Sequence, residues 1–153
     1  MKTLITPAEV VELAFTSDSC VRASQIPLVE IVAAQEEQLR PVFGALLDAM
    51  LEGQYEALLG EWIKPALAEF VRSRVVLSLG MVSSSGVAAH NHSGTRPATS
   101  DELLRVSREA AARARTLRAR ALAIVEASPE LFPEYSSENN ILNRIHIVGG
   151  IIV

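Results

Sequence analysis

The fold is decided by the stretch at residues 55–79, YEALLGEWIKPALAEFVRSRVVLSL. Apolar residues recur here at steps of three and four, the spacing that places them along one stripe of an α-helix. The stretch also contains Trp62, the single tryptophan of the chain, and large aromatic side chains bury the most apolar surface per residue. Residues 55–79 are therefore predicted to form the central core helix.

Pro65 lies in the middle of this stretch. Proline has no amide hydrogen to donate to the carbonyl group four residues earlier, and its ring crowds the preceding turn. The sequence therefore predicts a bend between Trp62 and Leu67. Two arrangements would produce it, a kink in one helix or a junction between two helices.

Two capping boxes mark the starts of further helices. Thr6 and Glu9 stand three residues apart, as do Thr99 and Glu102, and each pair can satisfy two free amide groups of a first helical turn. Pro41 is expected to separate two helices in the N-terminal half. The predicted helices are residues 6–15, 27–40, 41–52, 55–79 and 100–127.

The helix over residues 100–127 is the longest uninterrupted one. Its apolar positions form one seam that is narrowed by alanines, so a neighbouring helix can approach closely. The helix is expected to pack antiparallel on the central helix, across a loop at residues 82–99. Residues 1–153 are therefore predicted to form a mostly all-α, single-domain helical bundle with a long central helix pair. The seam consists of Leu103, Val106, Ala110, Ala114, Leu117, Ala121 and Ile124.

Two segments differ from the helices. Residues 82–99 are rich in Ser, Gly, Asn and His and show no period, so they are predicted to form a long loop, which can hold a short hairpin. Residues 141–153 end in a β-branched run and are predicted to form a strand-like C-terminal arm. A single strand needs a second edge, which could lie within the chain or on a neighbour. The candidate contact residues of the arm are Ile147, Val148, Ile151 and Ile152.

Charge is distributed unevenly. The net charge is −4, yet six arginines fall between Arg105 and Arg120, whereas the chain up to Trp62 has ten acids and three bases. This polarity suits self-assembly in which an acidic face of one copy meets a basic face of the next, although simple solvated helix faces would also explain it. Arg113 and Arg120 are expected to flank the seam. The candidate assembly contacts, expected on the far side of the helix, are Arg105, Arg108, Arg115 and Arg118.

Composition restricts the class of protein. Hydrophobic residues make up 49% and the mean hydropathy is +0.25, so either the core is large or other copies cover some apolar surface. No run of eighteen apolar residues is present, and Glu9 and Glu12 interrupt the N-terminal apolar stretch, so neither a membrane helix nor a signal peptide is expected. Cys20 is the single cysteine, which excludes an internal disulfide and fits a reducing cytoplasm.

No catalytic motif stands out. The sequence has no glycine-rich phosphate loop, no nucleophile elbow and no HExxH motif. His90 and His92 alternate as two ligands of one metal could, and with His146 they are the basis for a small metal-dependent enzyme. Exposed loop histidines are the simpler interpretation, because no third ligand stands nearby in the sequence. We expect no catalytic residue, no cofactor and no small-molecule substrate.

The arginine-rich helix suggests another alternative, a DNA-binding helical regulator that uses residues 105–120. Guanidinium groups bind phosphates well. Against this role, the whole chain is acidic and no aromatic residues are interleaved with the arginines.

A family resemblance is carried by residues spread along most of the chain. The more specific blocks are Ile63-Lys64-Pro65-Ala66-Leu67-Ala68, which follows Trp62, and Phe132-Pro133-Glu134-Tyr135. The others are Lys2-Thr3-Leu4-Ile5, Glu9-Val10, Leu13-Ala14-Phe15, Pro41-Val42-Phe43-Gly44, Leu46-Leu47, Tyr55, Leu58-Leu59, Asn139 and Gly149-Gly150. In this pattern the chain resembles a prophage-encoded family of small helical proteins associated with the head–tail connectors of tailed phages, also called adaptor or head-completion proteins. Residues 82–99 depart from the family pattern.

The resemblance implies a structural role without catalysis. Such proteins form rings of identical subunits below the portal of the capsid, extend the DNA channel and offer a platform for the tail. The implied partners are further copies of the chain, the portal protein and tail-completion proteins, with non-specific contact to packaged DNA. The implied location is the cytoplasm of the bacterial host and then the virion.

Overall fold

The computed structural model describes residues 2–15, 21–82, 88–91, 94–144, 147–148 and 151–152. Its α-helices are α1 (Pro7–Ala14), α2 (Leu28–Ala34), α3 (Arg40–Phe43), α4 (Ala45–Leu51), α5 (Glu56–Leu58), α6 (Lys64–Val82), α7 (Ser100–Ala127) and α8 (Ile141–Arg144). Two π turns, η2 (Gln35–Leu39) and η3 (Leu59–Ile63), lie within longer helices. Short 3-10 turns are η1 (Ala23–Gln25), η4 (Pro129–Leu131) and η5 (Ser137–Asn139). The predicted helical bundle is confirmed.

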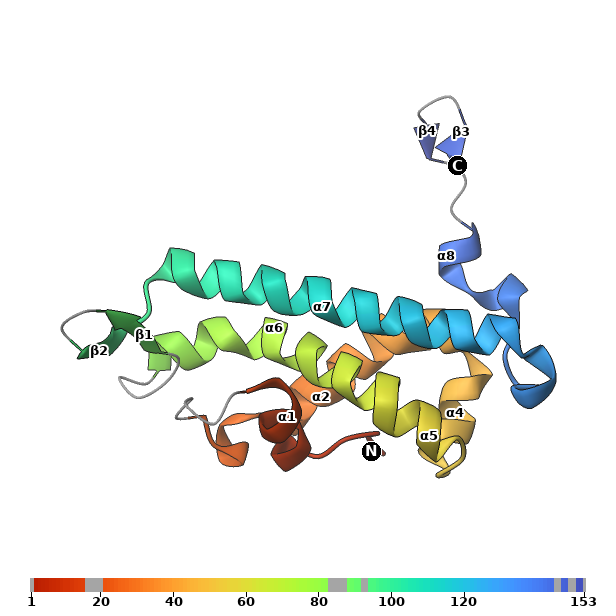
Figure 1. Cartoon of the computed structure of the whole chain (residues 1–153), viewed down its shortest axis with the longest axis horizontal. Helices are drawn as coiled ribbons and strands as arrows, with labels where there is room; N and C mark the ends of the chain where they lie inside the picture. The colour runs from red at the N-terminus through yellow and green to blue at the C-terminus, as the bar shows by residue number, and fades with distance from the viewer. Residues whose placement is uncertain are drawn as a thin grey trace.

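α6 and α7 form the long central pair (Figure 1). The relative direction of the two helices follows from three contacts between them. As the residue number increases along α7, the residue number of its partner on α6, or on the turn before α6, decreases. Ser107 Oγ donates to Ser73 O at 2.7 Å, and Arg113 bonds Glu69. Further toward the C-terminal end of α7, the Arg120 guanidinium lies over the Trp62 ring. The pair is antiparallel, as the sequence predicts, and α1 and α2 pack on other faces of α6.

Both capping boxes form. At the start of α1, Thr6 Oγ1 accepts from the Glu9 amide at 3.3 Å, and Glu9 Oε2 accepts from the Thr6 amide at 2.7 Å. At the start of α7, Thr99 and Glu102 exchange the same two bonds at 3.3 and 2.8 Å. The predicted bounds of α7 agree with the structure to the residue, because an ideal cap starts the helix and Pro129 follows its end.

The two internal prolines do not break their helices, which corrects the predicted break at Pro41 and the two-helix alternative for Pro65. Helix continues through Pro41 to Phe43 and through Pro65 to Val82. A π turn ends two residues before each proline, with the Arg40 amide bonded to Gln35 O and the Lys64 amide to Leu59 O. The wider turn repositions the carbonyl groups that would meet the proline ring. The helix therefore continues although proline donates no backbone hydrogen bond.

The break in the first of these helices lies at Gly44 instead of Pro41. Gly44 has φ 53° and ψ −126°, a backbone conformation that side-chain-bearing residues rarely adopt. In the second helix the π turn spans Leu59–Ile63, so it begins before the expected bend between Trp62 and Leu67 and overlaps it at Trp62 and Ile63. The two-helix alternative for Pro65 is therefore wrong.

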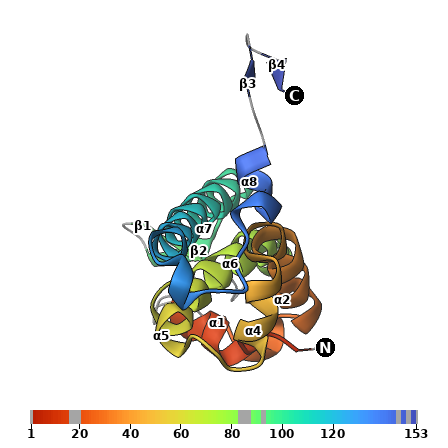
Figure 2. The same ribbon diagram turned by 90° about the vertical axis from the view of Figure 1, so that its right-hand side faces the viewer.

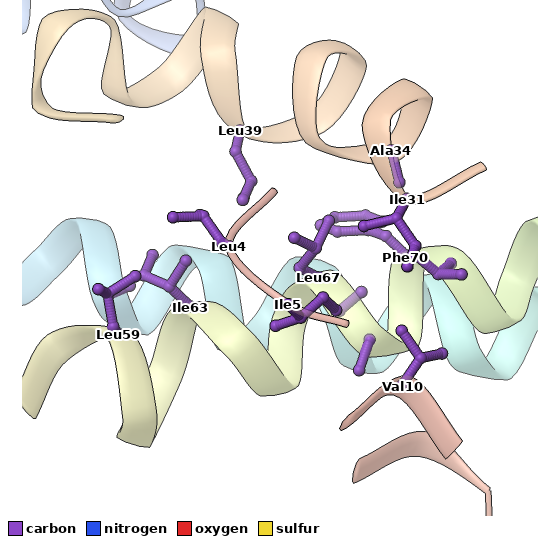
Figure 3. Close-up of a cluster of buried hydrophobic side chains, with 14 of the residues drawn as sticks. Leu4, Ile5, Val10, Ile31, Ala34, Leu39, Leu59, Ile63, Leu67 and Phe70 are labelled. Carbon is purple, nitrogen blue, oxygen red and sulfur yellow. The ribbon is translucent and has the colours of Figure 1, made fainter. Parts of the chain in front are cut away.

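The core lies where α6 meets the N-terminal segment, α1 and α2 (Figure 3). Gln35, the first residue of the π turn η2, is a buried polar side chain, and its Oε1 accepts from the Leu4 amide at 3.0 Å. The turn thus ties the N-terminal segment to the bundle. Fully buried apolar side chains at this centre include Ile5, Val10, Ile31, Leu39, Ile63 and Leu67.

Two short hairpins complete the described chain. In residues 82–99, β1 (Ala88–Asn91) pairs antiparallel with β2 (Gly94–Pro97), with Ala88 opposite Pro97. At the C-terminus, β3 (Ile147–Val148) pairs antiparallel with β4 (Ile151–Ile152). The edge that the terminal strand needs is thus supplied within the chain. This hairpin stands away from the helical body on the α7 side in both views (Figures 1 and 2).

Candidate functional site

The side of α7 that faces away from the bundle carries three free arginines. Arg105, Arg108 and Arg115 are exposed and make no ion pair with any other described residue. At 1.5 Å per residue they span about 15 Å of the helix. Leu104 lies beside them and is 39% exposed. We call these four residues the outer face of α7.

Arg118 does not belong to the outer face, which corrects the sequence prediction. It follows Ala114 by four residues and precedes Ala121 by three, so it neighbours two fully buried positions on the helix surface. Its Nη1 donates to Gln38 O at 2.8 Å, and its guanidinium lies 5.4 Å from the centre of the Phe70 ring. Burial, and then the nearby Arg115 charge, lower the pKa of Arg118.

The remaining arginines of α7 flank the seam, as predicted. Arg113 Nε lies 3.1 Å from Glu69 Oε1, and the Arg120 guanidinium lies 5.8 Å from the centre of the Trp62 ring. Both contacts join α7 to the helix that contains α6. These arginines stabilise the body, and only three of the four candidate assembly residues on α7 are free to meet a partner.

Half of the acids before Trp62 are paired inside the chain. Lys64 binds Glu9 at 2.7 Å. Arg40 bridges Glu36 at 2.9 Å and Asp48 at 2.6 Å, and Arg74 bridges Glu30 and Glu37 at 2.7 Å each. The hydrogen bonds from Lys64 and Thr6 lower the pKa of Glu9, and the bond from Arg40 lowers that of Glu36. Five of the ten acids before Trp62 are thus neutralised locally.

Of the acids that have no described ion-pair partner, four lie at the end of the bundle where α5 begins, whereas Glu12, Asp101 and Glu109 lie on α1 and α7. Glu52, Glu56, Glu61 and Glu130 are exposed and make no ion pair with another described residue. We call these four residues the acidic end. The Tyr55 and Phe132 rings, 5.1 Å apart, hold the two segments that carry them together. The charge polarity seen in the sequence therefore survives folding as two separate surfaces.

Tyr55 secures this end in a way that sequence reasoning missed. It has a left-handed backbone, with φ 62°, and its hydroxyl donates to Glu134 Oε2 at 2.6 Å. That hydrogen bond raises the pKa of Tyr55. Since the partners are 79 positions apart, no local pattern indicates the contact.

Tyr135 forms a second link at the same end. Its hydroxyl donates to Glu126 Oε1 at 2.8 Å and accepts from Asn140 Nδ2 at 3.0 Å. Burial, and then the bond to Glu126, raise the pKa of Tyr135 to about 12. Asn140 is fully buried, so the chain after α7 is anchored before it reaches α8. Phe132 and Tyr135 thus anchor the segment after α7 to the body.

The candidate residues of the C-terminal arm all lie in its hairpin. Ile147 stands opposite Ile152, and Val148 opposite Ile151. The surroundings of their side chains fall outside what the structure describes. The arm leaves the body at the end where α7 finishes (Figure 1).

The histidines are not brought together as a described metal site. His90 lies in β1 opposite Thr95, whereas His92, His146 and Cys20 lie outside the described residues. Among the residues that the structure describes, no three His, Cys, Asp or Glu side chains are grouped to bind a metal ion.

Two surface grooves provide no reactive arrangement. One, of about 340 Å³, lies between the N-terminal segment and the turn before α5, and its Lys64 is already bonded to Glu9. The other, of about 500 Å³, lies between α1, α6 and α7 and includes Arg72. Arg72 Nη1 donates to Ala14 O at 2.8 Å, and its guanidinium lies over the Phe15 ring. Burial lowers the pKa of Arg72.

Comparison with known proteins identifies the family. A family model described as a family of unknown function (DUF6712) matches residues 29–145, which is 117 of the 153 residues. The chain belongs to this family. The match runs from α2 to the foot of the arm, so it includes the π turns, the outer face of α7 and the acidic end. No curated protein and no solved structure matches the chain. No described helix is long and apolar enough to cross a membrane.

Proposed function

We propose that this DUF6712 protein is a structural subunit of the head–tail connector of a tailed phage or prophage. It assembles into a ring of identical copies that joins the portal and capsid to the tail and lines the DNA channel. It works by self-assembly, without catalysis and without a cofactor. It is made in the cytoplasm of the bacterial host and ends at the head–tail junction of the virion.

The observation that carries this proposal is the C-terminal arm. Its hairpin has two paired residues on each strand and stands off the helical body (Figures 1 and 2). A hairpin this small has too few contacts to be stable alone in water. Its sequence, IHIVGGIIV, is too apolar for a solvated tail. A neighbouring molecule that covers the arm would remove its apolar residues from water. This favours a protein that acts as a subunit of an assembly.

The family resemblance favours a connector over other assemblies. One of its specific blocks includes the end of the π turn η3 and Pro65, and the other forms the turn that packs Phe132 on Tyr55. Both blocks therefore shape the helical body, and this agrees with a structural role for the protein. The free arginines of the outer face also suit non-specific contact with packaged DNA.

The proposal is tested first by mass. Native mass spectrometry of the full chain at high protein concentration should show a closed ring of one size. A monomer at all concentrations, with portal and tail-completion proteins also present, would contradict self-assembly. Deleting the gene from the phage that encodes it should give heads without tails, whereas tailed, infectious particles would exclude the connector role.

A second candidate function is favoured by one observation, the three free arginines spaced along about 15 Å of α7. The isolated protein would then be a DNA-binding regulator that contacts phosphates through Arg105, Arg108 and Arg115. Tight binding of duplex DNA that weakens steeply with added salt, and that is lost in Arg108→Ala/Arg115→Ala, would favour this role. Equal affinity of the variant and the native chain would exclude it.

A further inference from the structure

We propose that the outer face of α7 is a docking surface for the acidic end of a second copy of this chain. The inference rests on the proposed self-assembly and names the contact that builds it. The outer face is Leu104, Arg105, Arg108 and Arg115, and the acidic end is Glu52, Glu56, Glu61 and Glu130.

Charge is the first argument. Lys64, Arg40, Arg74 and Arg113 each have an acidic partner within the chain. The three arginines of the outer face and the four acids of the acidic end have none among the described residues. The two surfaces are therefore complementary between copies, because the arginines of one copy can pair with the glutamates of the next.

Apolar exposure is the second argument. Leu104 is 39% exposed beside the outer-face arginines, and Leu131 is 62% exposed directly after Glu130. Each charged surface therefore includes one large apolar side chain that contact with another copy would remove from water. A contact with DNA phosphates offers neither leucine an apolar partner.

The positions of the two surfaces make the contact head-to-tail. Ser107 bonds Ser73 and Arg113 bonds Glu69, so the outer face runs from the first turns of α7 to its middle. The acidic end lies at the start of α5, at the other end of the pair (Figure 1). Joining unlike surfaces leaves one of each free on every dimer, so addition continues until a ring closes. The C-terminal arm leaves the body at the same end of the α6–α7 pair, on its α7 side (Figure 1).

Charge-reversed variants test this contact. Arg108→Glu/Arg115→Glu places acids opposite acids and should weaken self-association about 100-fold. Glu52→Lys/Glu130→Lys should weaken it similarly, because basic groups then face basic groups. The control Lys2→Glu/Arg22→Glu changes the net charge as much as the first variant, at exposed positions outside both surfaces, and should associate like the native chain. Sedimentation velocity at fixed salt measures all four proteins.

Mixing the two defective variants gives the decisive result. In an equimolar mixture the reversed outer face of one variant meets the reversed acidic end of the other, and the unreversed outer face of the second variant meets the unreversed acidic end of the first. Opposite charges then meet at every contact between unlike variants, and assemblies should return. Loss of association in each variant with recovery in the mixture supports the docking surface. No recovery, or assembly of either variant alone at native strength, overturns it.

Failure of this contact is distinguishable from failure of the proposed function. If the native chain forms rings and Arg108→Glu/Arg115→Glu also does, the subunits meet through other surfaces and only the docking surface is wrong. If that variant forms rings but loses binding to duplex DNA, the outer face contacts nucleic acid instead. If the native chain never associates, the proposed self-assembly fails with it.

Discussion

Gly44 ends the helix that passes through Pro41. A Cβ atom added to Gly44 would meet nothing within 4 Å, so an alanine there is opposed by the backbone conformation alone. The Gly44→Ala variant should lower the free energy of unfolding by about 1–3 kcal/mol, measured by urea denaturation. Gly60→Ala is the matched control, because Gly60 is helical and also faces open space. It should leave stability unchanged or raise it by up to about 1 kcal/mol. Equal losses in both variants would contradict the backbone explanation.

Tyr135 couples stability to high pH. Its folded pKa is about 12 against an ordinary value of 10.0, because burial and Glu126 disfavour the phenolate. The contribution of protonated Tyr135 to the free energy of unfolding is therefore complete below pH 10 and is lost as the pH rises through about 12. In Tyr55→Phe, Tyr135 is the single tyrosine, and its ultraviolet titration should have its midpoint near 12. A midpoint that stays at the denatured-state value while circular dichroism shows intact helix would contradict the buried hydrogen-bonded site.

At the scale of elements, the alanine seam sets how closely α6 and α7 approach. Ala114 is fully buried in the seam, whereas Ala112 faces solvent on the same helix. Ala114→Leu should destabilise the protein by about 1–3 kcal/mol, since the added carbons have no space between the helices. Ala112→Leu adds the same atoms outside and should change the free energy of unfolding by less than about 0.5 kcal/mol. Denaturation midpoints of the two variants should therefore differ, and similar midpoints would show that the interface is loosely packed.

The sequence predicted the elements whose signals are local. The bounds of α7 follow from the box of Thr99 and Glu102, and the antiparallel pair follows from its seam. Pro41 was misjudged as a break, because a periodicity of 3.6 residues contains no signal for a π turn that spares the helix. The position of Arg118 was misjudged because its contact with Gln38 joins residues 80 positions apart. Three of the four arginine candidates could be placed from the helical period alone, whereas their lack of ion-pair partners among the described residues required the structure.

At the scale of the whole molecule, the arm and the body are separate stability units. Ending the chain after residue 144 removes the hairpin of β3 and β4, which stands apart from the bundle (Figure 2). The free energy of unfolding should change by less than about 0.5 kcal/mol, while self-association weakens. Urea denaturation and sedimentation velocity measure the two effects on the same sample. A large loss of stability would mean that the arm packs on its own body.

The two π turns have a consequence for how relatives of this chain can differ in length. A π turn contains one residue more than an α turn. Each of the two helices therefore has one residue more than a regular α-helix of the same length in space would need. Removing that residue would close an ordinary turn, but it would also return the proline ring to the carbonyl group four residues earlier. Single-residue deletions at Gln35–Leu39 or Leu59–Ile63 should therefore occur in relatives together with replacement of Pro41 or Pro65, and the residues before the turn should shift their apolar positions by one.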